Sequence, residues 1–506
     1  MFIRKSVNRS GNTSIQVTEK TGRKNRIVKH IGTGRTPAEI EQLVDSARKF
    51  IDGKRIKSGV ISFFDTRFER SKLKELLDSL SFVQVLDTII YRFIYHFYKT
   101  IGFHKIKDDC FADLVVARIV EPASKRQTKD ILTEKFGKKY PLNRIYLTLK
   151  NTIKSNYQEK IEEIAYRFIR KYVIQNITVL FFDVTTLYFE AFDEDDLRKN
   201  GFSKDNKFNQ PQILVALAVT TFGMPLAMKM FEGDTFEGHT MVPCIEEAMS
   251  RFSPDDIVVV ADAAMLSEDN LEKLEAKRLK YIVGARLGNI RSILFEKITS
   301  GLPKEDNSFQ RLPLENDRIL LVNYSLKRAA KDKHDREKQI QKAKEMLLAP
   351  QKVARRYKFI TSKGKKQFKL NQKLIEKAEK LEGIKGYITN AIQLTDKEII
   401  DKYTELWQVE KSFRMSKSDL KARPIFHTLR ESIEAHLLIV FTALVTSRYI
   451  EYVTKQSIHT IIKILSRVKE IVVEDKVTKE QASKLTDLSD EARLLMGYTR
   501  FGSLKK

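Results

Sequence analysis

The sequence predicts an α/β protein built around a mixed β-sheet with flanking helices. Three observations lead to this class. Stretches rich in Val, Ile, Leu and Phe, which are typical of strands, recur between about 177 and 284. Stretches with helical periodicity lie between the later ones, around 240–252 and 267–278. A mainly helical region precedes this core, and a β-rich, basic insertion interrupts it before a helical end.

Bulk composition limits the classes of function. A chain of 506 residues is too long for one ordinary core, so several domains are expected. Its net charge of +26 favours a polyanionic partner, nucleic acid rather than a membrane surface. We find neither about 18 consecutive apolar residues nor a secretory signal, so no membrane association is expected. The two distant cysteines, Cys110 and Cys244, suit a reducing compartment and exclude a cysteine-rich zinc site. A cytoplasmic, nucleoid-associated protein is therefore expected.

Residues 1–50 are expected to form a basic β-hairpin and a helix. The alternating stretches TSIQVTEK and NRIVKHIG flank a turn at 21–24. The helix should begin with Thr36 as N-cap and Pro37 at its first position, and Glu39 would complete a capping box. Residues 51–175 show helical periodicity, and in so basic a chain we assign them as a helical DNA-binding region.

The α/β core is expected in two parts. Its first part, 176–286, carries five candidate strands, in ITVLFFDVTTLYFEA, PQILVALAVTTF, PLAMKMFEG, DIVVVADAA and KYIVGARLG. Its second part, 396–456, reads as a long helical stretch, followed by a helical tail over 457–506. Residues 432–455 are apolar around most of a helix circumference, so we expect that helix to be buried within its own fold. Only its far end and the tail would then remain for a partner.

The insertion, 287–395, separates the two parts. SFQRLPLENDRILLVNYSL predicts short strands, RAAKDKHDREKQIQKAKEMLL a basic helix, and GIKGYITNA a returning strand. Residues 321–380 hold 19 Lys and Arg but 6 Asp and Glu, an excess of 13 that is half of the net charge. A solvated helix with i,i+4 pairs would explain a basic helix alone. An excess of this size favours phosphate contact, with Lys363, Lys365 and Lys366 as candidates.

Two aspartates follow apolar strand residues. Asp183 interrupts ITVLFFDVTTLYFEA, and Asp262 follows DIVVVA among small alanines. A carboxylate in an apolar strand is costly unless a cation neutralises it. Each could instead lie at a solvated strand end or start a helix. Two of them in a basic protein favour a hard cation such as Mg²⁺ and phosphoryl transfer on nucleic acid. The acidic run EAFDEDDL, 190–197, reads as an exposed loop instead.

A third carboxylate lies in DKYTELWQVEKSFRMSKSDLKARPIF. Tyr403, Glu410 and Lys417 are spaced by seven residues, which would place them on one stripe of a continuous helix, with Arg414 beside it. The alternative is an amphipathic helix with an ordinary Glu410–Arg414 pair. Trp407 could pack in the core or stack on a base.

Three further features bear on possible binding roles. Lys204, in GFSKD, could position a phosphate. The histidines, including His239 and His427, show no paired metal spacing and are read as structural. The GxxxxGK[ST] motif is absent, so no nucleotide cofactor is expected.

With these motifs, the sequence resembles the bacterial insertion-sequence transposases of the DDE type, in the branch with a β-rich insertion. That branch carries the signature Y-x2-R-x3-E-x6-K, which Tyr403, Glu410 and Lys417 match. Leu406 occupies the arginine position, and Arg414 or Lys411 could replace it. Further matches are DVTTLYFEA, GFSKDNKFNQPQILVAL, ADAAM and KARPIFH, over roughly 175–450, with a weaker one in ARIVEPASKRQTKDIL, 117–132.

The resemblance implies an RNase H-like catalytic fold in which Asp183, Asp262 and Glu410 hold two Mg²⁺ ions, with Mn²⁺ as a substitute. Its expected DNA contacts are Tyr403, Trp407, Arg414, Lys417 and Lys204. It also implies cut-and-paste transposition, in which a homodimer joins two terminal inverted repeats in a synaptic complex and inserts them into target DNA. Two alternatives stay open: a nuclease of the same fold without strand transfer, and a non-catalytic DNA-binding protein.

Overall fold

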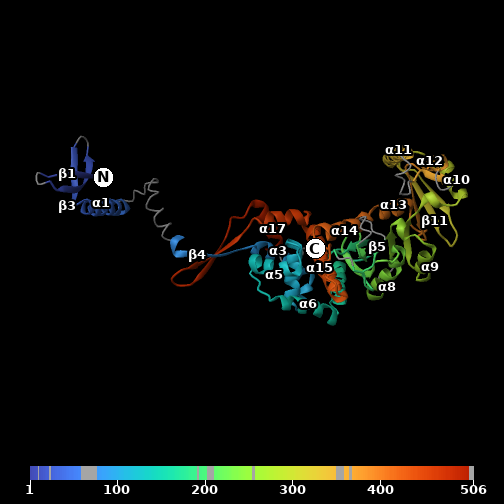
Figure 1. The fold of residues 1–506 in the computed structure, drawn as a ribbon, viewed down its shortest axis with the longest axis horizontal. Coiled ribbons are helices and arrows are strands. Elements are labelled where there is room, and N and C mark those ends of the chain that lie inside the picture. Colours follow the sequence, from blue (N-terminus) through green and yellow to red (C-terminus); the bar gives the residue numbers. More distant parts are fainter. Residues whose placement is uncertain are drawn as a thin grey trace. The chain divides into compact units, whose positions relative to one another are not determined.

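The computed structural model describes residues 1–8, 11–21, 24–57, 77–190, 193–201, 210–252, 257–348, 358–363 and 367–500. The chain divides into two units. One comprises Met1–Phe82 and Val473–Ala482, and the other comprises Val83–Val472 and Ser483–Lys506. Figure 1 traces the elements along the chain. Lys204, Lys365 and Lys366 lie outside the described residues, as does the side chain of Lys363.

The N-terminal elements form a three-stranded antiparallel sheet rather than the predicted hairpin. Its strands, in the order β1-β2-β3, are Phe2–Val7, Thr13–Thr21 and Lys24–Gly34. Strand β1 was not predicted because its residues, FIRKSV, do not alternate between apolar and polar, and most of them are exposed. Helix α1, Pro37–Lys57, packs on the sheet and begins with the predicted capping box. Thr36 Oγ1 accepts from the Glu39 N–H at 3.3 Å, and Glu39 Oε2 accepts from the Thr36 N–H at 3.3 Å.

Within the described part of the predicted helical region, five α-helices follow: α3 Thr88–Ile101, α4 Asp109–Val120, α5 Lys125–Phe136, α6 Leu142–Lys154 and α7 Tyr157–Tyr172. Two local predictions were wrong. Strand β4, Leu80–Leu86, lies in the region expected to be helical, and the C-terminal tail contains a hairpin between its helices. The strands of that hairpin, β15 Glu470–Asp475 and β16 Gln481–Leu485, form a sheet with β4 in the order β16-β15-β4. Such pairing joins segments nearly 400 residues apart, which local periodicity cannot indicate.

The mixed α/β core is confirmed. An eight-stranded sheet has the order β10-β11-β14-β9-β8-β5-β6-β7. Strands β5, β8 and β9 are parallel neighbours, and the others pair antiparallel. Helices α8, Met241–Phe252, and α9, Glu268–Ala276, connect the central strands. The strands are β5 Val179–Tyr188, β6 Gln212–Val219, β7 Pro225–Glu232, β8 Val258–Ala261, β9 Lys280–Gly284, β10 Phe309–Pro313, β11 Ile319–Tyr324 and β14 Ile384–Thr389.

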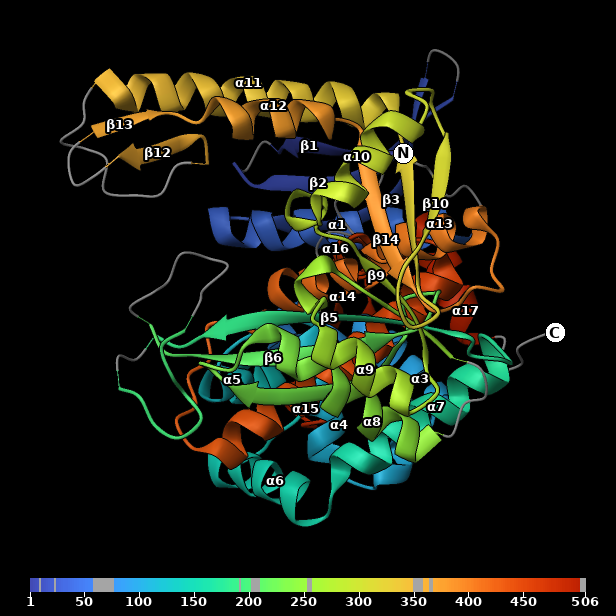
Figure 2. The same ribbon diagram turned by 90° about the vertical axis from the view of Figure 1, so that its right-hand side faces the viewer.

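The predicted insertion, 287–395, extends this sheet instead of forming a β-rich part of its own. Its strands β10, β11 and β14 continue the sheet from the edge of β9. The remainder is largely helical, and Figure 2 shows α11 and α12 side by side. These elements are α10 Ser292–Gly301, α11 Leu326–Leu348, β12 Ile360–Lys363, β13 Gln367–Leu370 and α12 Gln372–Lys380. Without the insertion, β9 would be an edge strand with unpaired backbone N–H and C=O groups. Strand β14 pairs with these groups and so continues the sheet.

The expected long helix after residue 396 is divided into α13, Asp396–Thr404, and α14, Trp407–Ser418. Between them the chain tightens to i→i−3 hydrogen bonds, from the N–H of Leu406 to Tyr403 O at 3.1 Å and of Gln408 to Glu405 O at 2.9 Å. Tyr403 and Glu410 therefore lie on different helices, and the prediction of one continuous stripe was wrong.

Helix α15, Arg430–Thr454, is buried along most of its length, as predicted, and packs against α3, α4 and α6 (Figure 2). Of the described helices, it alone is long and apolar enough to cross a membrane by length and composition. The count of consecutive apolar residues did not detect it because polar residues are spread along it. In its most apolar window 94% of the residues are buried inside the protein, as in a core helix. The tail continues with α16, Ile458–Leu465, and α17, Asp490–Arg500.

Candidate active site

Asp183 and Asp262 directly follow the last residues that pair between two adjacent parallel strands, β5 and β8. The pairing of β5 with β8 runs in register to Phe182 opposite Ala261, so the next positions are the two aspartates. Side chains at equal register on parallel strands point to the same face of a sheet. Each carboxylate accepts a 2.7 Å hydrogen bond from the N–H of the residue that follows it. Asp183 is not at the end of β5, but it lies where β8 stops beside it.

Tyr403 connects the third predicted motif to the second aspartate. Its buried hydroxyl donates a 3.4 Å hydrogen bond to Oδ1 of Asp262, which is exposed at the end of β8. Gly284, at the end of β9, makes room for this contact. A Cβ atom added there would lie 2.4 Å from the Tyr403 hydroxyl oxygen and 3.1 Å from the Ala263 nitrogen. Only glycine at this position lets the tyrosine reach the aspartate.

Arg286 holds the turn that follows Asp262. Its Nε donates to Ala263 O at 2.8 Å and its Nη2 donates to Ala264 O at 3.1 Å. These carbonyls belong to the short 3₁₀ turn Ala263–Met265. The second aspartate is therefore fixed both by its own strand and by a side chain from the end of β9.

Lys385 of β14 shares an electrostatic environment with Asp262 and Glu410. Its ammonium lies 4.4 Å from the centre of the Tyr403 ring, a cation–π contact. Burial lowers the pKa of Lys385, while Asp262 and Glu410 both raise it. Burial raises the pKa of Tyr403, and the same two carboxylates raise it further. Tyr403 thus links Lys385 to Asp262 by direct contacts.

Glu410 lies in the first turn of α14 and is exposed. Arg414, one turn later, is exposed too, and no ion pair joins the two side chains among the described residues. The interpretation of a simple Glu410–Arg414 pair was wrong. Trp407 precedes Glu410 by three residues and is 49% exposed, which contradicts packing in the core. The indole of Trp407, the carboxylate of Glu410 and the guanidinium of Arg414 therefore follow one another along the exposed side of α14.

A buried arginine anchors α14 to the sheet. Arg448 of α15 donates to Gly223 O at 3.0 Å, in the turn between β6 and β7, and to Gln408 Oε1 of α14 at 2.8 Å. It also pairs with Glu451 at 3.2 Å. Gly223 has φ +70°, and a Cβ atom there would meet Arg448 Nη2 at 1.9 Å. This network sets the position of the helix that carries Glu410.

The cations around the signature have different surroundings. Lys417 is half-buried and lines a small cavity with Thr185 and Leu187, on the Asp183 face of β5. Helix α14 therefore covers the face to which Asp183 points. Lys411 pairs with Glu451 of α15 at 2.8 Å, which leaves it unsuited to replace the signature arginine. Leu406, at the arginine position, is 6% exposed, so a charged side chain would be buried there.

Two stretches that matched the family pattern meet in space. Lys125, from ARIVEPASKRQTKDIL, lies 3.4 Å from Nδ1 of His436, whose Nε2 lies 3.1 Å from Ala422 O, in KARPIFH. The carbonyl can only accept, so Nε2 carries the proton and Nδ1 accepts from Lys125. His427 lies against this group, its ring centre 5.7 Å from that of His436. His427 and His436 thus connect the chain after α14 to α5.

The arrangement was only partly visible in the sequence. Three of its participants were missed: Gly284, Arg286 and Lys385. A glycine closing an apolar strand, in KYIVGARLG, was a weak signal for a close approach. Nothing distinguished Lys385 from the other lysines of a very basic region. Among the described residues, no three His, Cys, Asp or Glu side chains are grouped closely enough to hold a metal ion by themselves.

Comparison with known proteins gives one family. Residues 175–446, more than half of the chain, match the family described as "Transposase DDE domain". No curated protein matches the chain. A cryo-EM structure of the piggyBac transposase synaptic complex with hairpin DNA is similar over 74% of this chain and 70% of that chain, with 10% sequence identity and a TM-score of 0.39.

Proposed function

Because this chain belongs to the transposase DDE domain family, we propose that Asp183, Asp262 and Glu410 are the acids at which it cuts and joins DNA. The observation that carries the assignment is the parallel pairing of β5 with β8, which ends at Phe182 opposite Ala261, immediately before Asp183 and Asp262. Glu410 lies in the first turn of α14, and this helix packs against β5, the strand that carries Asp183.

The family implies dependence on a divalent metal. We propose Mg²⁺, with Mn²⁺ as a substitute, two ions per site, held by the three acids. Carboxylate oxygens suit Mg²⁺, which proteins usually bind through one or two carboxylates together with substrate phosphates. When bound, the ions would stabilise the attacking and leaving oxygens of an in-line displacement.

The chemistry has two phosphoryl transfers. Water attacks a phosphodiester at the end of the element, which releases a 3′-hydroxyl. That hydroxyl then attacks a second phosphodiester, on the opposite strand or in target DNA, and displaces another 3′-oxygen. Tyr403 holds Asp262 in place, while Arg414 and Lys417 would position phosphates. Trp407 would stack on an unpaired base, since it is exposed beside Glu410.

The test of the function uses DNA that carries the terminal inverted repeats of the element, with Mg²⁺ or Mn²⁺. Joined products support a transposase, cut products alone a nuclease, and shifted but intact DNA a binding protein. Asp183→Asn, Asp262→Asn and Glu410→Gln should each abolish cutting and joining but retain end binding. Asp193→Asn, in the exposed acidic run, is the matched control and should behave as wild type. Strand transfer by any one of the three variants at the wild-type rate would remove that residue from the assignment.

We further propose that two protomers act together on paired ends. Mixtures of Glu410→Gln and wild-type protein would be tested on paired-end substrates. Joining should fall more steeply than the wild-type fraction, approaching its square, because both active sites would be needed in one complex. A loss in simple proportion would show that each protomer works alone.

A further inference from the structure

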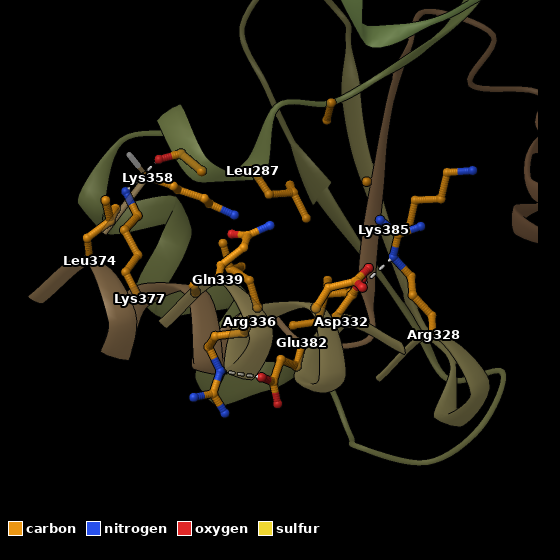
Figure 3. A pocket seen from close by; sticks show the side chains of 17 residues that line it. Leu287, Arg328, Asp332, Arg336, Gln339, Lys358, Leu374, Lys377, Glu382 and Lys385 are labelled. Carbon is orange, nitrogen blue, oxygen red and sulfur yellow. Dashed lines mark hydrogen bonds and ion pairs between the residues drawn. The ribbon is translucent and has the colours of Figure 1, made fainter. Parts of the chain in front are cut away.

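A cavity of about 410 Å³ adjoins Lys385 (Figure 3). Its walls come from α11, α12 and β14, together with the segment that follows β9. Figure 3 shows Lys385 and Arg328 on one side of this space and Lys358 and Lys377 on the other. Since Lys385 also contacts the Tyr403 ring, the cavity begins where the neighbourhood of Asp262 and Glu410 ends. Its volume is within the range of pockets for small molecules, and one nucleotide has about that size.

The carboxylates of the cavity are largely engaged by arginines. Asp332 pairs with Arg328 at 3.3 Å, and Glu382 pairs with Arg336 at 2.5 Å. The third, Asp335, is exposed. Two of the three negative charges in the walls are therefore paired with arginines before the lysines are considered.

The lysines of the cavity have no carboxylate partners among the described residues. Lys385 and Lys358 contact aromatic rings, of Tyr403 at 4.4 Å and of Phe359 at 5.3 Å. Lys377 donates to Gly288 O at 2.8 Å, which uses one of its three N–H groups. Three ammonium groups thus keep donors available around a space large enough for part of a nucleic acid strand.

We propose that this cavity binds the phosphodiester backbone of the DNA strand that is being cut. Lys385 would contact the phosphate nearest the acids, and Lys358 and Lys377 would contact phosphates farther along the same strand. A phosphate approaching two carboxylates is repelled unless cations lie nearby, and the ammonium of Lys385 lies against the ring of Tyr403, whose hydroxyl is bonded to Asp262. Charge-assisted hydrogen bonds from ammonium groups to phosphate oxygens are strong. The inference rests on the proposed function.

The test combines the replacement of each lysine with the neutralisation of each phosphate and measures DNA affinity. In a duplex that carries the terminal inverted repeat, phosphates of the cut strand are replaced one at a time by neutral methylphosphonate. At one position, the replacement should lower the affinity of wild-type protein roughly 10- to 100-fold. At that same position, the replacement should not lower the affinity of the Lys385→Met variant any further. Lys385→Arg, which keeps the charge, should respond to the replacement as wild type does. Lys338→Met removes one charge from the exposed side of α11 outside the cavity, and it should couple to no phosphate.

Lys358→Met and Lys377→Met should couple to other positions of the same strand. The cavity does not hold the strand if Lys385→Met and methylphosphonate reduce the affinity independently at every position. The same conclusion follows if only one of the three lysines shows a non-independent effect with a phosphate. Failure of the proposed function would look different, because wild-type protein would neither cut nor join the unmodified duplex. Binding would still reveal the coupling in that case.

Discussion

The hydroxyl of Tyr403 donates a 3.4 Å hydrogen bond to Oδ1 of Asp262, across 141 positions of sequence. One partner stands at the end of α13 and the other at the end of β8. The contact joins the last third of the domain to the central sheet and is possible only because Gly284 has no side chain. The position of the Asp262 carboxylate therefore depends on Tyr403, which belongs to the same sequence motif as Glu410.

Loss of the Tyr403 hydroxyl should slow DNA cutting more than it weakens end binding. Tyr403→Phe keeps the ring that Lys385 contacts but leaves Asp262 without one donor. We expect roughly a tenfold lower cutting rate and a loss of about 1 kcal/mol in the free energy of unfolding. Tyr281→Phe is the control, since it removes a buried hydroxyl bonded to Glu275 at 2.6 Å. Tyr281→Phe should lower the free energy of unfolding but should not slow cutting selectively. Equal effects of Tyr403→Phe and Tyr281→Phe on the cutting rate would contradict the prediction.

A side chain at position 284 should displace Tyr403. Gly284→Ala places Cβ within 2.4 Å of the hydroxyl oxygen, so tyrosine must move or the strand must shift. We expect a destabilisation of about 1–3 kcal/mol and a strong loss of cutting. In the double variant with Tyr403→Phe the closest contact disappears, so the two effects should not add. Strict additivity in a double-mutant cycle would show that the clash is not with this hydroxyl.

Replacement of Arg448 should loosen α14. Arg448→Met removes the bonds to Gly223 and Gln408, although Glu451 keeps its pair with Lys411. Breaking a buried ion pair costs about 3–5 kcal/mol, and we expect the lower end because Glu451 stays paired. Urea unfolding measures the change. Arg430→Met, at the exposed start of the same helix, should cost less than about 1 kcal/mol. Similar losses for both variants would contradict the anchoring role.

Trp407→Ala should weaken DNA binding without destabilising the fold. The indole is 49% exposed, so folding gains little from it. Stacking on a base is worth about 1–3 kcal/mol, and affinity for end DNA with unpaired bases should fall accordingly. Phe309→Ala, which removes a 51% exposed ring from the outermost strand β10, is the control. Unchanged affinity in the Trp407 variant, measured by fluorescence anisotropy, would leave the indole without a role in binding.

Stability should fall as the pH drops below about 6.5, because His436 and His427 take up protons more readily when unfolded. Burial lowers the pKa of His436 well below its ordinary value and that of His427 to about 4, and nearby Lys125 and Arg118 add to both shifts. The folded form excludes these protons, so the contribution is fully present above the unfolded pKa and declines toward pH 4. Each histidine should add about 1.4 kcal/mol per pH unit to the slope. His436→Gln should reduce the slope of unfolding free energy against pH between 6 and 5, whereas an unchanged slope would contradict the assignment.

The sequence by itself determined the kind of elements and several of their ends. Runs of β-branched and aromatic residues predicted β5, β6, β8 and β9, and the capping box at Thr36 and Glu39 marked the start of α1. The three carboxylates were also found in the sequence, because acids beside apolar strands and a seven-residue spacing are local signals. These features depend on side chains a few positions apart, where periodicity of two or of 3.6 residues decides which face is apolar.

The tertiary structure alone decided which elements are neighbours. It set Asp183 beside Asp262, joined Tyr403 to Asp262 over Gly284, and extended the sheet from β9 with strands of the predicted insertion. It also paired β4 with a hairpin near the C-terminus and divided the helix before Glu410. Strand register, close backbone approach and the pairing of an open edge depend on residues tens to hundreds of positions apart. No local pattern records them, since their energy arises only when the distant segments are packed together.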